Sequence, residues 1–205
     1  VIAKSENSGV NWEPVWGEWG GFGTGVDVIK FHPDNENELW AGGQGGIENG
    51  FLLKSENNGD DWTEWYDLAE NPSVAKEILF DHDDAEKVYV GFEGALVATS
   101  NGGTEWTTLI DSTDDSRFFF GIGKSETVGD LLFTAGWLKK FDDPQPLILF
   151  YSIDDGENWK QLEYAPEDFG GVYDLKIISE EAQERIFLGL YKGGVYEVLV
   201  KKASL

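Results

Sequence analysis

The chain has 205 residues but no cysteine and no methionine, and it contains only two histidines. The absence of cysteine excludes disulfides, thiol catalysis and Cys-based zinc sites, and it leaves the redox compartment open. No apolar run approaches the roughly 18 residues of a membrane-spanning helix, so no membrane span is expected. No signal peptide is visible, and a chain that starts at Val1 without methionine is expected to be a processed form or a fragment.

Basic residues are scarce as well: 15 Lys and Arg stand against 39 Asp and Glu, which gives a net charge of −24. Nucleic acids and anionic membrane surfaces are recognised through Lys and Arg, so neither is an expected partner. Two interpretations of the acidity stay open. One is a soluble, self-repelling surface, and the other is cation binding by clustered carboxylates.

A calcium cage needs about six to eight oxygen ligands. No twelve-residue Asp-x-Asp-x-Asp-Gly loop ending in Glu occurs, and acidic runs such as 81–84 have the composition of solvated turns. His32 precedes a proline, and His82 lies among three acids, so both are expected to be structural turn residues. The sequence therefore predicts no metal and no cofactor.

The chain is rich in aromatic residues and glycine, with 9 Trp, 13 Phe, 7 Tyr and 26 Gly. This composition is typical of turn-rich all-β folds, and the length predicts one domain, residues 1–205. The most informative feature is an octet, Ser/Thr-x-Asn/Asp-x-Gly-x-x-Trp, which occurs four times with starts 50, 44 and 53 residues apart. The octet residues are Ser5, Asn7, Gly9, Trp12; Ser55, Asn57, Gly59, Trp62; Thr99, Asn101, Gly103, Trp106; and Ser152, Asp154, Gly156, Trp159. A period of that size indicates a repeat architecture.

Each octet has the chemistry of a hairpin corner. Hydroxyl and Asn or Asp side chains bond to nearby backbone N–H groups and hold a tight turn. Glycine at the fifth position tolerates positive φ, and the tryptophan is expected to open the next strand with a large apolar surface.

The four octets resemble the Asp-box (BNR) repeat of sialidases, sortilin-type receptors, xyloglucan-degrading glycosidases and photosystem assembly factors. The resemblance covers nearly the whole chain. It implies an all-β fold, a β-propeller of four-stranded antiparallel blades in which the octet closes the turn between the third and fourth strands. It does not specify the activity, because those relatives include enzymes, receptors and chaperones.

Strand-like runs recur around the octets. First strands are expected at 27–31, 76–80, 117–122 and 174–178, and second strands at 38–41, 87–92, 130–137 and 185–191. Third strands are expected at 1–4, 51–54, 95–98, 148–151 and 195–198. Nearly continuous apolar runs such as 147–151 indicate burial on both faces, as between the blades of a propeller.

The strand count leaves two alternatives, because there are five third strands but only four of each other kind. In one, the N- and C-terminal strands share one blade and close a ring of four blades. In the other, the chain is a fragment of a larger ring, and self-association is then possible.

In the family, the binding face lies opposite the octets, so the resemblance implies that the octet residues are structural. Carried onto this chain, that face consists of loops near 14–26, 66–75, 109–116 and 160–173, with 42–50, 93–94, 138–147 and 192–194. Three aromatic residues lie among glycines in the first loop and predict an apolar platform for a sugar ring or a partner side chain. The alternative is that they plug the channel or pack between blades. The expected ligand-binding residues are Trp16, Trp19, Phe22, Trp137 and Tyr164.

The expected function is a non-catalytic binding or scaffold module for a glycan or a protein loop. One alternative is a glycoside hydrolase that uses two loop carboxylates, for which Asp168 and Asp142 are the candidates, if they lie about 5–9.5 Å apart. A further alternative is an assembly chaperone. Sialidase activity is excluded because those enzymes clamp their substrate with three arginines, and this chain has only Arg117 and Arg185. The resemblance alone implies an extracellular, periplasmic or cell-surface location.

Overall fold

The computed structural model describes residues 1–17, 25–45, 49–65, 74–111, 117–138, 147–162 and 170–205. The described residues form antiparallel β-sheets and one 3₁₀ turn, Lys202–Ser204 (η1), which confirms the all-β prediction. They contain no helix with the length and apolarity needed to cross a bilayer.

In the part of the chain that the structure describes, seventeen strands build five sheets. The N-terminal hairpin pairs β1 (Ile2–Lys4) with β2 (Glu13–Trp16). Blade 1 consists of β3 (Gly25–Phe31), β4 (Leu39–Gly45), β5 (Asn49–Ser55) and β6 (Thr63–Trp65). Blade 2 consists of β7 (Ala75–Phe80), β8 (Val88–Phe92), β9 (Ala95–Thr99) and β10 (Thr107–Asp111). Blade 3 consists of β11 (Arg117–Lys124), β12 (Leu132–Leu138), β13 (Leu147–Ser152) and β14 (Lys160–Gln161). The terminal sheet consists of β15 (Val172–Ser179), β16 (Gln183–Leu190) and β17 (Val195–Lys201).

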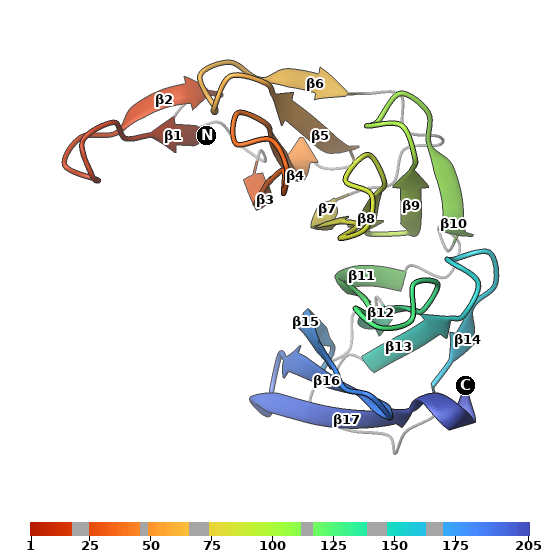
Figure 1. Cartoon of the computed structure of the whole chain (residues 1–205). Helices are drawn as coiled ribbons and strands as arrows, with labels where there is room; N and C mark the ends of the chain where they lie inside the picture. The colour runs from red at the N-terminus through yellow and green to blue at the C-terminus, as the bar shows by residue number, and fades with distance from the viewer. Residues whose placement is uncertain (18–24, 46–48, 66–73, 112–116, 139–146, 163–169) are drawn as a thin grey trace.

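The sheets follow one another around an arc, with the first strand of each blade on the inside (Figure 1). Strands β3, β7, β11 and β15 contact each other in that order along the inner side. Within every complete blade the strands run antiparallel in chain order from the inside outward, which is the blade of a β-propeller. Three complete blades and two incomplete sheets make a partial propeller. The hairpin and the terminal sheet are separate sheets here, so a blade shared by the two ends stays a prediction.

The predicted strands are confirmed, with two differences at their ends. First, each octet tryptophan lies one residue before its fourth strand instead of opening it. Second, β4 continues through the glycine run to Gly45, where a loop was expected from residue 42. A Cβ atom on Gly43 would lie 1.9 Å from the carbonyl oxygen of Gly25, so this close pairing of β3 with β4 requires glycine.

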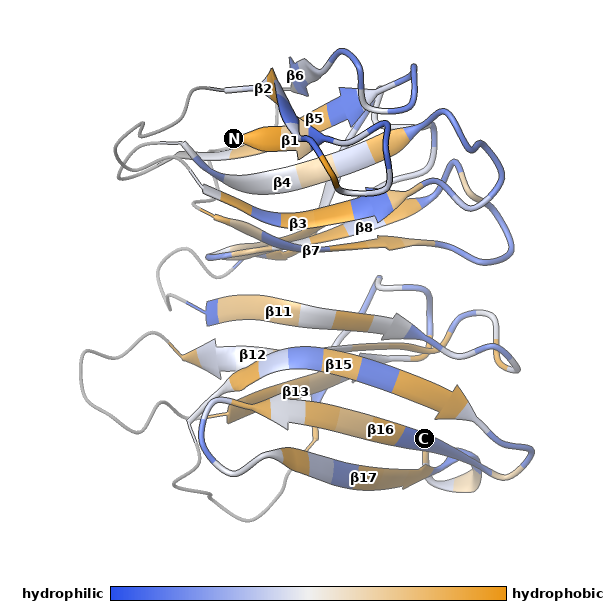
Figure 2. Ribbon diagram, turned by 90° about the vertical axis from the view of Figure 1, so that its left-hand side faces the viewer, coloured by the Kyte–Doolittle hydropathy of each residue, from blue (hydrophilic) through white to orange (hydrophobic). Residues whose placement is uncertain are grey.

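The core lies between consecutive sheets. Apolar side chains from both neighbours form one cluster at each junction, and the strands carry apolar residues along most of their length (Figure 2). The largest of these side chains are fully buried: Trp40 and Ile78 lie between blades 1 and 2, Tyr89 and Phe119 between blades 2 and 3, and Phe133 and Leu175 between blade 3 and the terminal sheet. Burial on both faces explains why the strands read as continuous apolar runs.

All four octets fold in the same way. In the second octet, the Gly59 amide donates to Ser55 Oγ over 2.9 Å, the Asp61 amide donates to Asn57 Oδ1 over 2.9 Å, and Trp62 Nε1 donates to the Gly59 carbonyl over 3.1 Å. The same three bonds occur in the other octets. The fourth position is also left-handed, with φ of 58° at Ser8, Asn58 and Asp155 and 63° at Gly102.

The octets bond to the turn between the first and second strands of their own blade, and their tryptophans contact the preceding sheet. The amides of Asn58, Gly102 and Asp155 donate to the carbonyl groups of the residues ahead of the second strands, Asn37, Glu86 and Asp130. The last three octet tryptophans pack into the junction with the preceding sheet. Trp12 meets no preceding sheet among the described residues, and it is 59% exposed.

Candidate functional site

The blades have two chemically different edges. Each octet joins a third strand to a fourth. It lies at the same edge as the turn between the first and second strands. In blade 1, for example, Leu39 at the start of β4 pairs with Phe31 at the end of β3 and with Ser55 at the start of the octet. The opposite edge carries the start of each first strand and the end of each second strand. The predicted binding loops connect strands at this second edge.

The four inner strands share an irregularity close to the second edge. In each one the pairing skips a single residue, between Val26 and Val28, Ala75 and Glu77, Phe119 and Gly121, and Val172 and Asp174. The skipped residues are Asp27, Lys76, Phe120 and Tyr173. β-Bulges of this kind change the direction of one side chain and are frequent next to functional sites.

The four skipped residues form a chain of contacts across the inner strands, which we name the bulge row. Lys76 Nζ lies 2.7 Å from Asp27 Oδ1. The same ammonium lies 5.4 Å from the ring centroid of Phe120, within the range of a cation–π contact. The Phe120 and Tyr173 rings meet edge to face with centroids 5.4 Å apart. One end of the bulge row is therefore charged and the other is aromatic.

Further rings extend the aromatic end. The ring centroid of Trp137 lies 4.3 Å from that of Phe120 and 4.7 Å from that of Tyr173. The ring centroids of Tyr191 and Tyr173 are 5.6 Å apart. With Phe118, 5.5 Å from Trp137, these residues form what we name the aromatic wall. Tyr173 and Tyr191 are its accessible part, at 48% and 52% exposure, whereas Phe118 and Phe120 are buried.

Glycines bring the backbone close to the aromatic wall. A Cβ atom on Gly171 would lie 2.2 Å from Trp137, so the chain entering β15 lies directly against the indole. Gly170 has a φ of 75°, and a Cβ atom there would lie 2.9 Å from the Tyr191 ring. Both positions need glycine if the rings are to keep their places.

Electrostatics at the inner strands are set by paired charges. Burial raises the pKa of Glu77 above its usual value, although Lys30 Nζ lies 2.6 Å from its carboxylate. Burial, with a smaller effect of Tyr191, raises the pKa of Tyr173, so its hydroxyl stays protonated and can donate a hydrogen bond at neutral pH. The inner strands thus present stacked rings, one phenol donor and paired charges, which suit a ligand with both an apolar face and polar substituents.

Two predicted ligand-binding residues are described by the structure. Trp137 lies in the aromatic wall. Trp16 packs between the hairpin and blade 1, with its ring centroid 5.1 Å from that of Phe51. This agrees with the alternative in which the aromatic residues of the first loop pack between blades. The other predicted residues, Trp19, Phe22 and Tyr164, and the candidate acids Asp142 and Asp168, lie outside the described residues.

Asp27, Lys76, Phe120, Tyr173 and Tyr191 were not predicted from the sequence. A signal exists for the first four, because each stands among the first four residues of a first strand. That signal becomes readable only when the four first strands are aligned with one another.

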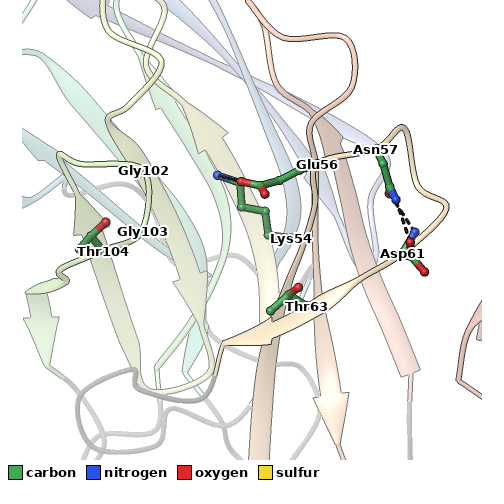
Figure 3. A pocket seen from close by; sticks show the side chains of 8 residues that line it. All are labelled: Lys54, Glu56, Asn57, Asp61, Thr63, Gly102, Gly103 and Thr104. Atoms are coloured by element: carbon green, nitrogen blue, oxygen red, sulfur yellow. Dashed lines mark hydrogen bonds and ion pairs between the residues drawn. The ribbon is translucent and has the colours of Figure 1, made fainter.

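The octet edge holds a polar cavity between the octets of blades 1 and 2, of about 450 Å³ (Figure 3). Lys54 lies in it with its ammonium 3.0 Å from Glu38 and 3.5 Å from Glu56. Asn57 Nδ2 donates to Asp61 over 2.9 Å. Lys54 is thus paired with two carboxylates and Asn57 with Asp61 of its own octet, which agrees with a structural role for this edge.

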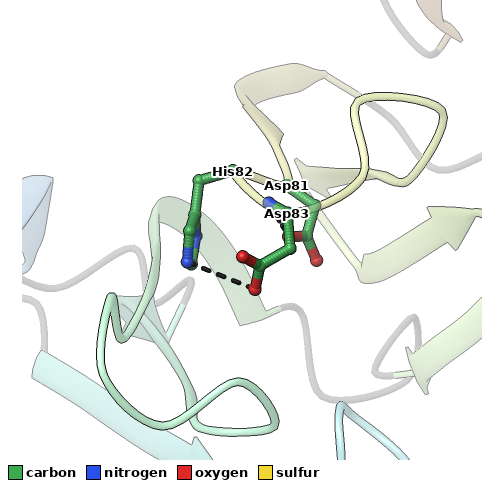
Figure 4. A group of neighbouring side chains, drawn as sticks. All are labelled: Asp81, His82 and Asp83. Carbon is green, nitrogen blue, oxygen red and sulfur yellow. Dashed lines mark hydrogen bonds and ion pairs between the residues drawn. The ribbon is translucent and has the colours of Figure 1, made fainter.

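The acidic turn after β7 brings together Asp81, His82 and Asp83 (Figure 4). Burial alone would raise the pKa of Asp81, but hydrogen bonds from Lys124 and from the Asp83 amide outweigh it and lower the pKa. His82 Nε2 lies 3.3 Å from Asp83. Because the Lys124 ammonium already neutralises the buried carboxylate, this turn links blades 2 and 3 electrostatically.

Comparison with known proteins places the fold. No family model and no curated protein matches the chain. An ancestral GH74 enzyme superposes with a TM-score of 0.68 at 22% identity, over 85% of this chain and 25% of that one. The GH74 xyloglucanase from Xanthomonas campestris superposes with a TM-score of 0.56 at 14% identity, over 85% of this chain and 29% of the xyloglucanase. YCF48 bound to D1 peptide superposes with a TM-score of 0.53 at 15% identity, over 88% of this chain and 54% of YCF48. The chain thus spans between a quarter and about half of these proteins. At these identities the likeness identifies the fold alone, a β-propeller.

Proposed function

We propose that this chain is a non-catalytic binding module that holds a glycan or a protein segment against the aromatic wall and the bulge row. The observation that carries the proposal is the pair of half-exposed tyrosines, Tyr173 and Tyr191, stacked on buried rings at the edge opposite the octets. Rigid rings that are already packed lose little conformational freedom on binding. They also offer an apolar surface to a sugar face or to a side chain.

Paired charges support binding over hydrolysis. A glycoside hydrolase needs one carboxyl group to give a proton and a second one to act as base or nucleophile. The inner-strand carboxylates Asp27 and Glu77 are held by Lys76 and Lys30 at 2.7 and 2.6 Å. Lys76 and Lys30 hold these carboxylates in fixed orientations, which suits the recognition of hydroxyl or amide groups.

We further propose that the octets are Asp-box repeats. Support comes from the identical bonding of all four and from their position between third and fourth strands. The GH74 xyloglucanase and YCF48 bound to D1 peptide supply the choice of probes, xyloglucan oligosaccharides and a D1-type peptide. An extracellular, periplasmic or cell-surface location is part of the same proposal, since a polysaccharide ligand would be met there.

The test is isothermal titration with each probe on the wild type and on the variant Tyr191→Ala. Truncating a ring at the centre of a binding surface costs more than about 1 kcal/mol, so the Kd is expected to rise at least about fivefold. Trp12→Ala is the matched control, because it removes an aromatic side chain of 59% exposure at the octet edge and is expected to leave Kd unchanged. Equal effects of the two variants would contradict the proposal.

The alternatives give different results in the same samples. Release of reducing sugar from xyloglucan, abolished by Asp168→Asn, would establish the glycoside hydrolase. Tight peptide binding with no oligosaccharide binding would assign a protein segment as the ligand, a result that the proposed module and the assembly chaperone share. Binding of neither probe, in a chain that is folded by circular dichroism, would leave the aromatic wall without a ligand of these classes and would refute the proposal.

A further inference from the structure

The composition of the chain leaves an oxidant few kinds of side chain to attack. Cysteine and methionine are the side chains that peroxides oxidise most readily, and this chain contains neither. One-electron oxidation therefore falls on the indoles and phenols, of which the chain has 9 Trp and 7 Tyr. Which of these rings can react with one another depends on how they are placed in the structure.

Tyr173 and Tyr191 are the one pair of tyrosine rings in contact among the described residues. Their ring planes are tilted by 48° at a centroid distance of 5.6 Å. Both side chains are about half exposed, so an oxidant in solution can reach either ring. Tyr89, in contrast, is fully buried, and the rings of Tyr151 and Tyr196 contact no other aromatic ring in the described part of the chain.

The backbone keeps the two phenols together. Val172 of β15 pairs with Leu190 of β16, and the tyrosines are the next residues of the chain after this pair (Figure 1). The bulge at Tyr173 changes the direction of its side chain, and the Tyr191 amide donates to the Gly171 carbonyl over 2.9 Å. Because both residues are held in this way, each ring has a partner at a high effective concentration.

The net charge of the chain works against a competing reaction between two copies. At −24 the chains repel one another, and this repulsion is strongest at low salt, where it is poorly screened. A radical formed on either tyrosine therefore meets its neighbour in the same chain before it meets a second chain.

We propose that Tyr173 and Tyr191 are an oxidative modification site and form a dityrosine cross-link within the chain. The oxidant is hydrogen peroxide, used by a haem peroxidase. Each phenol gives up one electron and one proton and becomes a phenoxyl radical. The radicals join through a new bond between the ring carbons next to their oxygens, and the hydrogens on those carbons move to the oxygens and restore both phenols. The two electrons and two protons that leave convert one hydrogen peroxide into two waters.

The cross-link joins the accessible rings of the aromatic wall. It therefore makes the ligand site responsive to oxidants, a consequence that rests on the proposed function. The cross-link itself needs no ligand and is measured in its absence. Failure to cross-link and failure to bind a ligand are thus separate results.

The test is treatment of the full chain with a haem peroxidase and hydrogen peroxide at low salt, followed by dityrosine fluorescence and intact mass. The product is expected to fluoresce as dityrosine and to remain a monomer of 22.8 kDa that has lost two hydrogen atoms. After trypsin digestion, peptide 161–176, which contains Tyr173, should be joined to peptide 186–192, which contains Tyr191.

Phenylalanine variants assign the cross-link, because they keep the ring and remove the phenol. Tyr173→Phe and Tyr191→Phe are each expected to abolish the joined peptides, and the first also rules out Tyr164 of the same peptide. Tyr196→Phe, at a position of 41% exposure, is the matched control and should cross-link like the wild type. Dityrosine that persists in Tyr191→Phe, or a product found only between chains, would overturn the proposal. So would a wild type without dityrosine in a reaction that couples free tyrosine.

Discussion

Replacing Ser55 by alanine removes the hydroxyl that closes the second octet. The Gly59 amide donates to Ser55 Oγ over 2.9 Å, and both residues are buried. A buried donor left without a partner costs about 1–3 kcal/mol. For a domain of this size, each kcal/mol lowers the melting temperature by about 2–4 °C, so Ser55→Ala is expected to lower it by about 2–12 °C.

The first octet supplies an internal control for this prediction. Gly9 donates to Ser5 Oγ over 2.8 Å, but its amide is exposed, so water replaces the lost partner in Ser5→Ala. The expected cost is about 0.5 kcal/mol or less. Ser152, buried like Ser55 and bonded to Gly156 over 2.8 Å, should behave as Ser55 does. Urea unfolding followed by circular dichroism measures all three, and equal losses in Ser5→Ala and Ser55→Ala would refute the assignment of the cost to burial.

The remaining predictions concern the tryptophans and the charges. Trp106→Ala, which removes a ring 6.1 Å from the buried Trp40, is expected to cost about 3–5 kcal/mol, whereas Trp12→Ala should cost under about 1 kcal/mol; denaturant midpoints compare them. Glu77→Gln should raise the melting temperature at pH 7, because the folded pKa lies above the ordinary value of 4.5 and the ionised form is therefore destabilising there. The gain should vanish below about pH 4, where Glu77 is protonated in both states, and a gain that persists there would point to a change in the Lys30 contact. Finally, the net charge of −24 predicts a lower melting temperature at about 10 mM than at about 500 mM NaCl, and equal values would show that self-repulsion is negligible.

Much of the fold could be read from the sequence because the octets are local. Their bonds run between residues two to four positions apart, so side-chain type and spacing are enough to predict the corner. The apolar runs between octets then had to be strands buried on two faces. Residues 42–45 were misplaced, because glycine is typical of loops and nothing local reveals that another strand passes within contact distance.

The candidate site could not be read in the same way, because its geometry comes from pairing between strands. Whether Asp27 or Lys76 occupies a bulge depends on the register of the neighbouring strand. The contacts from Lys76 to Asp27 and Phe120 join three different sheets. Trp137 was predicted from its place at the end of a second strand, but its partners Tyr173 and Tyr191 follow from how two sheets stack.

The bonds that buried carboxylates make also depend on how the sheets stack. Two buried carboxylates at the octet edge are bonded across a junction between sheets. Asp81 is paired with Lys124 of blade 3. Glu184 of the terminal sheet accepts a bond from Ser125 of blade 3 over 2.5 Å and one from Ser179 of its own sheet over 2.7 Å. Such pairs stabilise the junctions only when both partners are present, since a single buried charge is costly.

The most direct test of a ligand site on the aromatic wall is ¹⁹F NMR of the chain labelled with 3-fluorotyrosine at its 7 tyrosines. Resonances are assigned by single Tyr→Phe variants, and xyloglucan oligosaccharide or D1-type peptide is then added to saturation. The account predicts that the Tyr173 and Tyr191 resonances shift while those of the buried Tyr89 and of Tyr196 stay in place. Saturable binding that leaves Tyr173 and Tyr191 unshifted would contradict it.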